Sequence, residues 1–90
     1  MNKNELISNV AESSGLTKAD ASRAVDSVLD SIQTSLSSQE EVRIAGFGTF
    51  TVSHRKATTG RNPRTGAPIQ IAASNMPKFR PGKGLREAVN

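Results

Sequence analysis

The sequence has 90 residues, with 12 Lys and Arg against 8 Asp and Glu, one histidine and no cysteine, and its formal net charge is +4. This length allows one small domain, and the lack of cysteine excludes disulfides, thiol nucleophiles and zinc sites built from several Cys or His ligands. Only 34% of the residues are hydrophobic and Phe is the only aromatic type, so we expect a thin core and an oligomeric protein.

Two amphipathic helices are predicted in the N-terminal half. Asn2 or Asn4 can cap the first helix, and Gly15 is a suitable left-handed end for it. Thr17 followed by Asp20 resembles a capping box and opens a longer second helix. The apolar stripe of this helix spans about 140° at ~100° per residue, which is wide enough for more than one neighbour. It consists of Ala21, Ala24, Val25, Val28, Leu29, Ile32 and Leu36.

The helical half is acidic. Residues 1–42 hold three Lys or Arg against seven Asp or Glu. Carboxylates at Asp20, Asp26 and Asp30 would repel phosphates, so the helix pair is predicted to be a packing scaffold rather than a helix-turn-helix DNA reader. We interpret residues 1–41 as a helical dimerisation base.

The C-terminal half is basic. Residues 43–90 hold nine Lys or Arg against Glu87 alone. This excess favours nucleic acid over a membrane surface as the partner, because the cations do not lie on an amphipathic helix. No apolar run approaches the ~18 residues of a membrane span, and the N-terminus does not resemble a signal peptide. A cytoplasmic location is therefore expected.

Antiparallel strands are predicted at the start of the basic half. Val42 and Ile44 alternate with polar residues, and a second alternating run contains Phe50. The glycines of Gly46-Phe47-Gly48 predict a tight turn between these strands. We expect Phe47 to be buried there rather than to stack on bases.

Residues 55–75 predict a long protruding β-hairpin arm. Large apolar residues are limited to Ile69 and Ile71, so the segment cannot bury a core of its own. The run Asn62-Pro63-Arg64-Thr65-Gly66 has turn chemistry, because Pro fixes φ and Gly tolerates a positive φ. Legs of about ten residues would each reach roughly 33 Å at ~3.3 Å per residue.

The remaining residues complete an α+β fold. Residues 76–80 are predicted to return as a short strand, and Pro81-Gly82 precede a terminal helix. We predict a two-helix N-terminal base, a three-stranded antiparallel sheet with the protruding arm, and a short C-terminal helix, all in one domain over residues 1–90. Residues 42–90 would form its nucleic-acid-binding part.

No catalytic or metal site is predicted. His54 has neither a carboxylate nor a nucleophile nearby in the sequence, which makes a polar strand position the better interpretation. Pro81-Gly82-Lys83-Gly84 lacks the Ser or Thr of a nucleotide-hydrolase phosphate loop. We therefore expect no enzyme activity, no cofactor and no metal.

Three segments of the chain closely resemble the bacterial histone-like HU/IHF family, with HU the nearer of the two. They are GFGTF at residues 46–50, GRNPRTG at residues 60–66, and Phe79 with Pro81-Gly82-Lys83 before the terminal helix. The resemblance covers the whole chain and implies an intertwined homodimer whose two β-arms enter the minor groove of double-stranded DNA. It further implies an architectural, largely sequence-independent protein that bends and compacts the bacterial chromosome in the nucleoid. HU and IHF insert apolar wedges between base pairs, and this role would fall on Pro63.

The resemblance and the charge pattern together select two groups of residues. The group expected to contact DNA is Lys3, Gly46, Arg55, Lys56, Arg61, Asn62, Pro63, Arg64, Thr65, Lys78, Arg80, Lys83 and Arg86. The expected dimer core is Leu29, Ile32, Leu36, Ile44, Phe47, Phe50 and Phe79. Thr58 departs from the family pattern, in which many relatives have a basic residue there.

Two alternative functions share parts of this pattern. Without a helix that reads base edges, binding is expected to favour bent, nicked or gapped duplexes over particular sequences. An IHF-like subunit paired with a paralogous chain would instead show a site preference of ~10³ or more. A single-strand or RNA-binding module would depend on exposed aromatic side chains.

Overall fold

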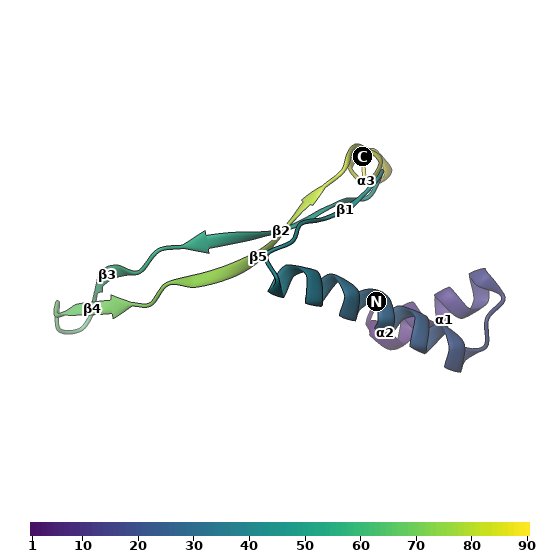
Figure 1. The fold of residues 1–90 in the computed structure, drawn as a ribbon, viewed down its shortest axis with the longest axis horizontal. Coiled ribbons are helices and arrows are strands. Elements are labelled where there is room, and N and C mark those ends of the chain that lie inside the picture. The colour runs from purple at the N-terminus through teal and green to yellow at the C-terminus, as the bar shows by residue number, and fades with distance from the viewer. The chain divides into compact units, whose positions relative to one another are not determined.

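A computed structural model describes residues 1–90 as three helices and five strands (Figure 1). In chain order they are α1 (Lys3–Ser14), α2 (Lys18–Ser37), β1 (Val42–Ile44), β2 (Gly48–Arg55), β3 (Thr58–Arg61), β4 (Pro68–Ile71), β5 (Ser74–Pro81) and α3 (Lys83–Ala88). The predicted α+β class is confirmed. The chain divides into two compact units, Met1–Thr34 and Ser35–Asn90, so the boundary lies inside α2 and before the division expected at residue 41.

Helix α1 has capping groups at both ends. The Asn2 side chain accepts a hydrogen bond from the Glu5 N–H at 2.9 Å, whereas Asn4 lies inside the helix. At the other end, Gly15 has a φ of 73° and its N–H donates to the Ala11 carbonyl. These bonds satisfy backbone groups that a helix leaves unpaired at its ends, and an N-cap of this kind contributes ~1 kcal/mol.

Helices α1 and α2 share a small apolar core. Thr17 Oγ1 accepts a hydrogen bond from the Asp20 N–H at 3.1 Å at the start of α2. The buried apolar residues of the whole chain are Ile7, Ala21 and Val25. Most of the stripe on α2 remains open, and the exposed fractions of Val28 and Leu29 are 57% and 45%. The core is thin, as the composition predicted.

Strands β1, β2 and β5 form an antiparallel sheet in the order β1-β2-β5. The turn between β1 and β2 is closed by a 3.0 Å hydrogen bond from the Phe47 N–H to the Ile44 carbonyl, and Gly46 has a φ of 79°. Strand β5 pairs with β2 over the full length of both. It spans Ser74–Pro81 and is longer than the strand predicted at residues 76–80.

Strands β3 and β4 form the distal part of the predicted hairpin arm (Figure 1). They are a separate two-stranded antiparallel sheet, because residues 56–57 and 72–73 interrupt the ladder. Ala57, Ala72 and Ala73 occupy three of these four positions. Alanine adds little to the cross-strand packing that stabilises a sheet, so the interruption falls where side-chain pairing is weakest.

The three phenylalanines cluster on the β1-β2-β5 sheet. The ring centroid of Phe79 lies 4.8 Å from that of Phe50 and 5.6 Å from that of Phe47. A Cβ atom at Gly48 would lie 2.5 Å from the Phe79 ring, so only glycine lets this ring lie over β2. Phe47 is nevertheless 45% exposed and Phe79 40%. The burial expected for Phe47 is therefore not achieved within one chain.

Helix α2 ends in an unfavourable backbone conformation. Its last turn is closed by a 2.8 Å hydrogen bond from the Glu40 N–H to the Ser35 carbonyl. The intervening Gln39 has a φ of 63° and is the only residue other than glycine with a positive φ. A side chain in this left-handed region costs about 1–2 kcal/mol, a cost that glycine avoids.

We predict that Gln39→Gly raises the free energy of unfolding. The gain is about 0.5–1 kcal/mol, because the relief of strain exceeds the extra backbone entropy of glycine in the unfolded chain. Urea unfolding at a fixed protein concentration measures it. Gln39→Ala is the matched control, since alanine keeps the strain and leaves stability unchanged. A Gly variant no more stable than the Ala variant contradicts the prediction.

Candidate nucleic-acid interface

The antiparallel pairing sorts the side chains of the β1-β2-β5 sheet onto two chemically different faces. Side chains alternate along a strand and residues opposite one another share a face. Arg43 pairs with Thr49, which pairs with Arg80 on its other side. The face defined by this row also carries Lys78 and Arg55. We call it the basic face.

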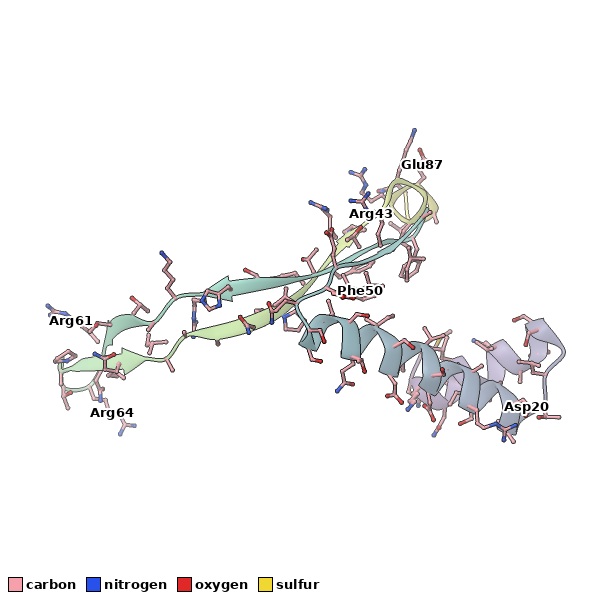
Figure 2. The ribbon with its side chains drawn as sticks, viewed as in Figure 1. Asp20, Arg43, Phe50, Arg61, Arg64 and Glu87 are labelled. Atoms are coloured by element: carbon pink, nitrogen blue, oxygen red, sulfur yellow. The ribbon has the colours of Figure 1, made fainter.

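The opposite face of the same sheet is apolar. Phe50 pairs with Val42 on one side and with Phe79 on the other. Val52 and Pro77 form the next pair on this face. In Figure 2 the Arg43 side chain projects from one side of the sheet and Phe50 lies on the other.

The basic face continues into the arm. Two residues interrupt the ladder on each strand, so the pairing resumes in an unchanged register. Alternation therefore places the Thr59–Gln70 and Arg61–Pro68 pairs on the same face as Arg55. The other face of the arm carries the pairs Thr58–Ile71 and Gly60–Ile69.

Backbone hydrogen bonds form a tight turn at the arm tip. The Asn62 N–H donates to the Ala67 carbonyl, and the Gly66 N–H donates to the Asn62 carbonyl, both at 2.8 Å. Gly66 has a φ of 71°, a value that glycine adopts without strain. Pro63 is held at the exposed end of this turn.

Two of the predicted DNA-contact residues at the tip form hydrogen bonds within the turn. Asn62 Oδ1 accepts the Arg64 N–H at 2.8 Å, and Thr65 Oγ1 accepts the Ala67 N–H at 3.2 Å. These oxygens therefore shape the tip. The guanidinium groups of Arg61 and Arg64 project to opposite sides of it (Figure 2).

Helix α3 packs closely on the β1-β2 turn. The Gly82 N–H donates to the Phe47 carbonyl at 2.8 Å, and a Cβ atom at Gly84 would lie 2.7 Å from the Gly46 carbonyl oxygen. This contact fixes the helix that carries Lys83 and Arg86. Gly46 thus contacts the helix that carries two of the predicted phosphate-binding cations.

Most cations of the basic half have no carboxylate partner. The ion pairs of the chain are Lys3–Asp26, Arg23–Asp20 and Lys83–Glu87. The Lys83 pair is long, at 3.9 Å, and exposed. All the cations of the basic face and of the arm are unpaired, so their charge is available to an anion from outside the chain.

Lys3 differs from the other predicted DNA contacts. Its ammonium lies 2.6 Å from Asp26 Oδ1 within the helical unit. The hydrogen bond to Asp26 and the negative charge of that carboxylate raise the pKa of Lys3 above its usual value. A phosphate must therefore compete with Asp26 for this lysine.

Arg43 is a candidate contact that the sequence prediction missed. It lies in β1 between Val42 and Ile44, and its pairing with Thr49 aligns it with Arg80. The sequence contained the signal, because the alternation that assigned Val42 and Ile44 to the apolar face assigns Arg43 to the other. His54, in contrast, is exposed on β2 with Nδ1 2.8 Å from Asn75 Oδ1, which agrees with a polar strand position.

Comparison with known proteins places the chain in a family. The family described as bacterial DNA-binding protein matches residues 1–90. DNA-binding protein HRL53 of Rhizobium leguminosarum is 63% identical over 90 residues, which cover 100% of this chain and 99% of that relative. DNA-binding protein HU of Geobacillus stearothermophilus is 54% identical over 89 residues, which cover 99% of each chain.

A solved structure gives the same result. An Anabaena HU–DNA cocrystal structure matches with a TM-score of 0.89 and 42% identity, covering 99% of this chain and 97% of that chain. The chain therefore belongs to the bacterial DNA-binding protein family, in which the HU proteins lie. The resemblance found in the sequence is confirmed. No helix of the chain is both long enough and apolar enough to cross a membrane.

We predict that Arg43→Ala weakens binding to duplex DNA. Affinity for DNA falls as the salt concentration rises, and each phosphate contact that is lost makes the slope of log affinity against log salt concentration about one unit less steep. Titrations of one labelled duplex at several salt concentrations give the slope. Arg23→Ala is the matched control, because Arg23 lies on α2 and is paired with Asp20. Equal slopes for the two variants would exclude Arg43 from the interface.

Proposed function

We propose that two copies of the chain form an intertwined homodimer that binds double-stranded DNA with little sequence preference and bends it. The β-arms of the dimer enter the minor groove. The observation that carries this proposal is the basic face, which runs without a change of register from Arg43 through Arg55 to Arg61. It leads to the exposed Pro63 at the arm tip.

The shape and charge of the arm suit a minor groove. A groove ~6 Å wide is too narrow for a helix, and the β3-β4 arm is a slimmer element, because its two strands lie only ~4.8 Å apart. Arginine side chains are favoured by the negative potential of a narrow minor groove. Arg55 and Arg61, on the face shared with Lys78 and Arg80, have no carboxylate partner that would offset this attraction.

Pro63 is suited to act as a wedge. The turn bonds of Asn62 and Gly66 hold it rigidly at the tip, and its ring is exposed. A rigid apolar ring can occupy an opened base step, which offsets a few kcal/mol of unstacking. We propose that each arm kinks the duplex in this way, so that bent, nicked or gapped DNA is preferred because part of the deformation is already made.

The homodimer follows from the apolar surface that one chain leaves open. Among the residues of the expected dimer core, Leu29, Ile44, Phe47 and Phe79 are exposed, and Ile32, Leu36 and Phe50 are half-buried. An apolar hollow of about 260 Å³ also opens between α1 and α2. It is lined by Leu6, Val10, Ala24, Val25, Val28 and Leu29. A second copy would cover this surface and supply the core that each chain lacks.

We propose that the protein is located on the bacterial chromosome. The protein acts as an architectural component of the nucleoid, and it requires neither a cofactor nor a metal. A single-strand binder would need aromatic rings and cations on one surface. Here Phe50 and Phe79 lie on the face opposite the basic face, which favours duplex binding.

We predict that unfolding depends on protein concentration. In an obligate dimer folding and association are coupled, so the thermal midpoint rises as the protein is concentrated. Calorimetry over a hundredfold concentration range measures this. Leu29→Glu introduces a charge at the proposed interface and lowers the midpoint, whereas Leu16→Glu, at a leucine of similar exposure in the α1-α2 loop, changes it little. A folded monomer of the parent chain in sedimentation at micromolar concentration would exclude the dimer.

We predict that Pro63→Ala separates DNA bending from DNA binding. Alanine keeps every charge of the arm, so the salt slope and the affinity for straight duplex stay nearly constant. The wedge is lost because the methyl group is too small to fill an opened base step. Fluorescence transfer between the ends of a duplex therefore reports a smaller bend, and most of the preference for gapped DNA disappears.

Pro68→Ala is the matched control for this experiment. Pro68 lies in the same arm as the first residue of β4, paired with Arg61 and outside the turn that carries Pro63, so its replacement leaves bending and the gapped-DNA preference intact. Should Pro63→Ala keep the parental bend, Pro63 is a turn residue only and the wedge is refuted.

A further inference from the structure

A single large apolar side chain lies on the basic face of the β1-β2-β5 sheet. Met76 in β5 pairs with Ser53 in β2, and this pair stands between the pairs that carry Lys78 and Arg55. Because side chains alternate along a strand, Met76 shares the face of these two cations. The other large apolar residues of the three strands lie on the opposite face.

The thioether of Met76 is open to small molecules. The residue is 52% exposed, and it lines a surface hollow of about 340 Å³ whose other walls include Arg55 and Lys78. In the proposed homodimer the partner covers the apolar face, so the side of the sheet that carries Met76 stays open. A small oxidant can therefore reach the sulfur.

Oxidation changes the chemistry of this position. A hydroperoxide transfers an oxygen atom to the methionine sulfur. The O–O bond breaks and an S–O bond forms, the sulfur is oxidised while the peroxide is reduced, and water leaves when the oxidant is hydrogen peroxide. The product is a sulfoxide, which puts a polar hydrogen-bond acceptor in place of an apolar group. Methionine sulfoxide reductases reverse the change.

A sulfoxide at Met76 disfavours DNA on the basic face. The apolar methionine can lie against the deoxyribose carbons of a DNA backbone without losing a hydrogen bond. The sulfoxide oxygen must instead lose its water beside the phosphates, or accept a hydrogen bond from Lys78 or Arg55. The first alternative costs desolvation free energy, and the second takes a donor from a phosphate. Both lower the affinity for DNA.

We propose that Met76 is a site of reversible oxidation by peroxides, and that its sulfoxide weakens the binding of DNA to the basic face. The inference rests on the proposed function, because it requires duplex DNA to lie on that face. The same contact protects the site. Bound DNA covers the thioether and slows its reaction with a peroxide, so free protein is oxidised faster than the complex.

The first test measures DNA affinity after treatment with hydrogen peroxide. Mass spectrometry of peptides gives the extent of oxidation at Met76 and at Met1, the other methionine of the chain. As Met76 is converted, the affinity for one labelled duplex falls by about three- to tenfold, the effect of one hydrogen bond of ordinary strength. Treatment with methionine sulfoxide reductases A and B restores the affinity.

Three variants assign this effect to one sulfur. Met76→Leu keeps an apolar side chain of similar volume, so it binds like the untreated parent and does not respond to peroxide. Met1→Leu removes a more exposed thioether, which belongs to the helical unit, and it responds as the parent does. Met76→Gln places a polar amide where the sulfoxide forms and lowers the affinity without peroxide.

The second test measures the rate of Met76 oxidation with and without duplex DNA. N-acetylmethionine amide in the same solution reports the activity of the peroxide, because DNA does not cover it. A saturating duplex slows the oxidation of Met76 severalfold relative to this reporter. Salt that dissociates the complex restores the rate of the free protein.

The outcomes separate the inference from the function on which it rests. If the untreated parent does not bind duplex DNA at low salt, the proposed function is wrong and so is the inference. If the parent binds, three results overturn the role of Met76 alone. They are an unchanged affinity after Met76 is oxidised, an equal loss of affinity in Met76→Leu, and an oxidation rate that duplex DNA does not slow.

Discussion

The unchanged register of the antiparallel ribbon is the constraint on which the rest of the structure depends. Strands β2 and β5 pair without a bulge, and two residues interrupt the ladder on each side before β3 and β4 resume it. A shift by one residue would move every side chain to the other face. Because no shift occurs, Arg55 and Arg61 stay on the face of Lys78 and Arg80, and the phenylalanines stay together on the other.

Because the two kinds of side chain are separated, each face of the sheet lacks a different kind of partner. The apolar face keeps Phe47 and Phe79 exposed in a single chain, and exposed apolar surface of this kind favours association. The basic face has cations without carboxylates, and their mutual repulsion falls only when an anion binds. Lys3 does not share this requirement, because Asp26 already balances its charge. The sheet thus leaves apolar surface open on one side and unpaired cations on the other.

Local rules predicted the elements better than they predicted the details of the site. The helix caps at Asn2 and Thr17 and the turn at Gly66 follow from backbone chemistry that a few adjacent residues determine. The extent of β5 depends on its pairing with β2, which no local pattern specifies. The turn bonds of Asn62 and Thr65 join residues only two positions apart and were within reach of local rules. They were missed because the family resemblance identifies the motif as a DNA contact but not which of its atoms are already used within the chain.

Strand β5 carries side chains of both faces on one backbone. Phe79 lies over Gly48 and against Phe50 on the apolar face, and its neighbours Lys78 and Arg80 lie on the basic face. In the proposed homodimer, a partner that buries Phe79 would immobilise the backbone that carries these two cations, so part of the ordering entropy of DNA binding would be lost on dimerisation. Gly48 is essential to this link, because a Cβ atom there would displace the Phe79 ring. We therefore expect the proposed dimerisation and DNA binding to be coupled through β5, so that a change at Gly48 weakens both without removing any charge.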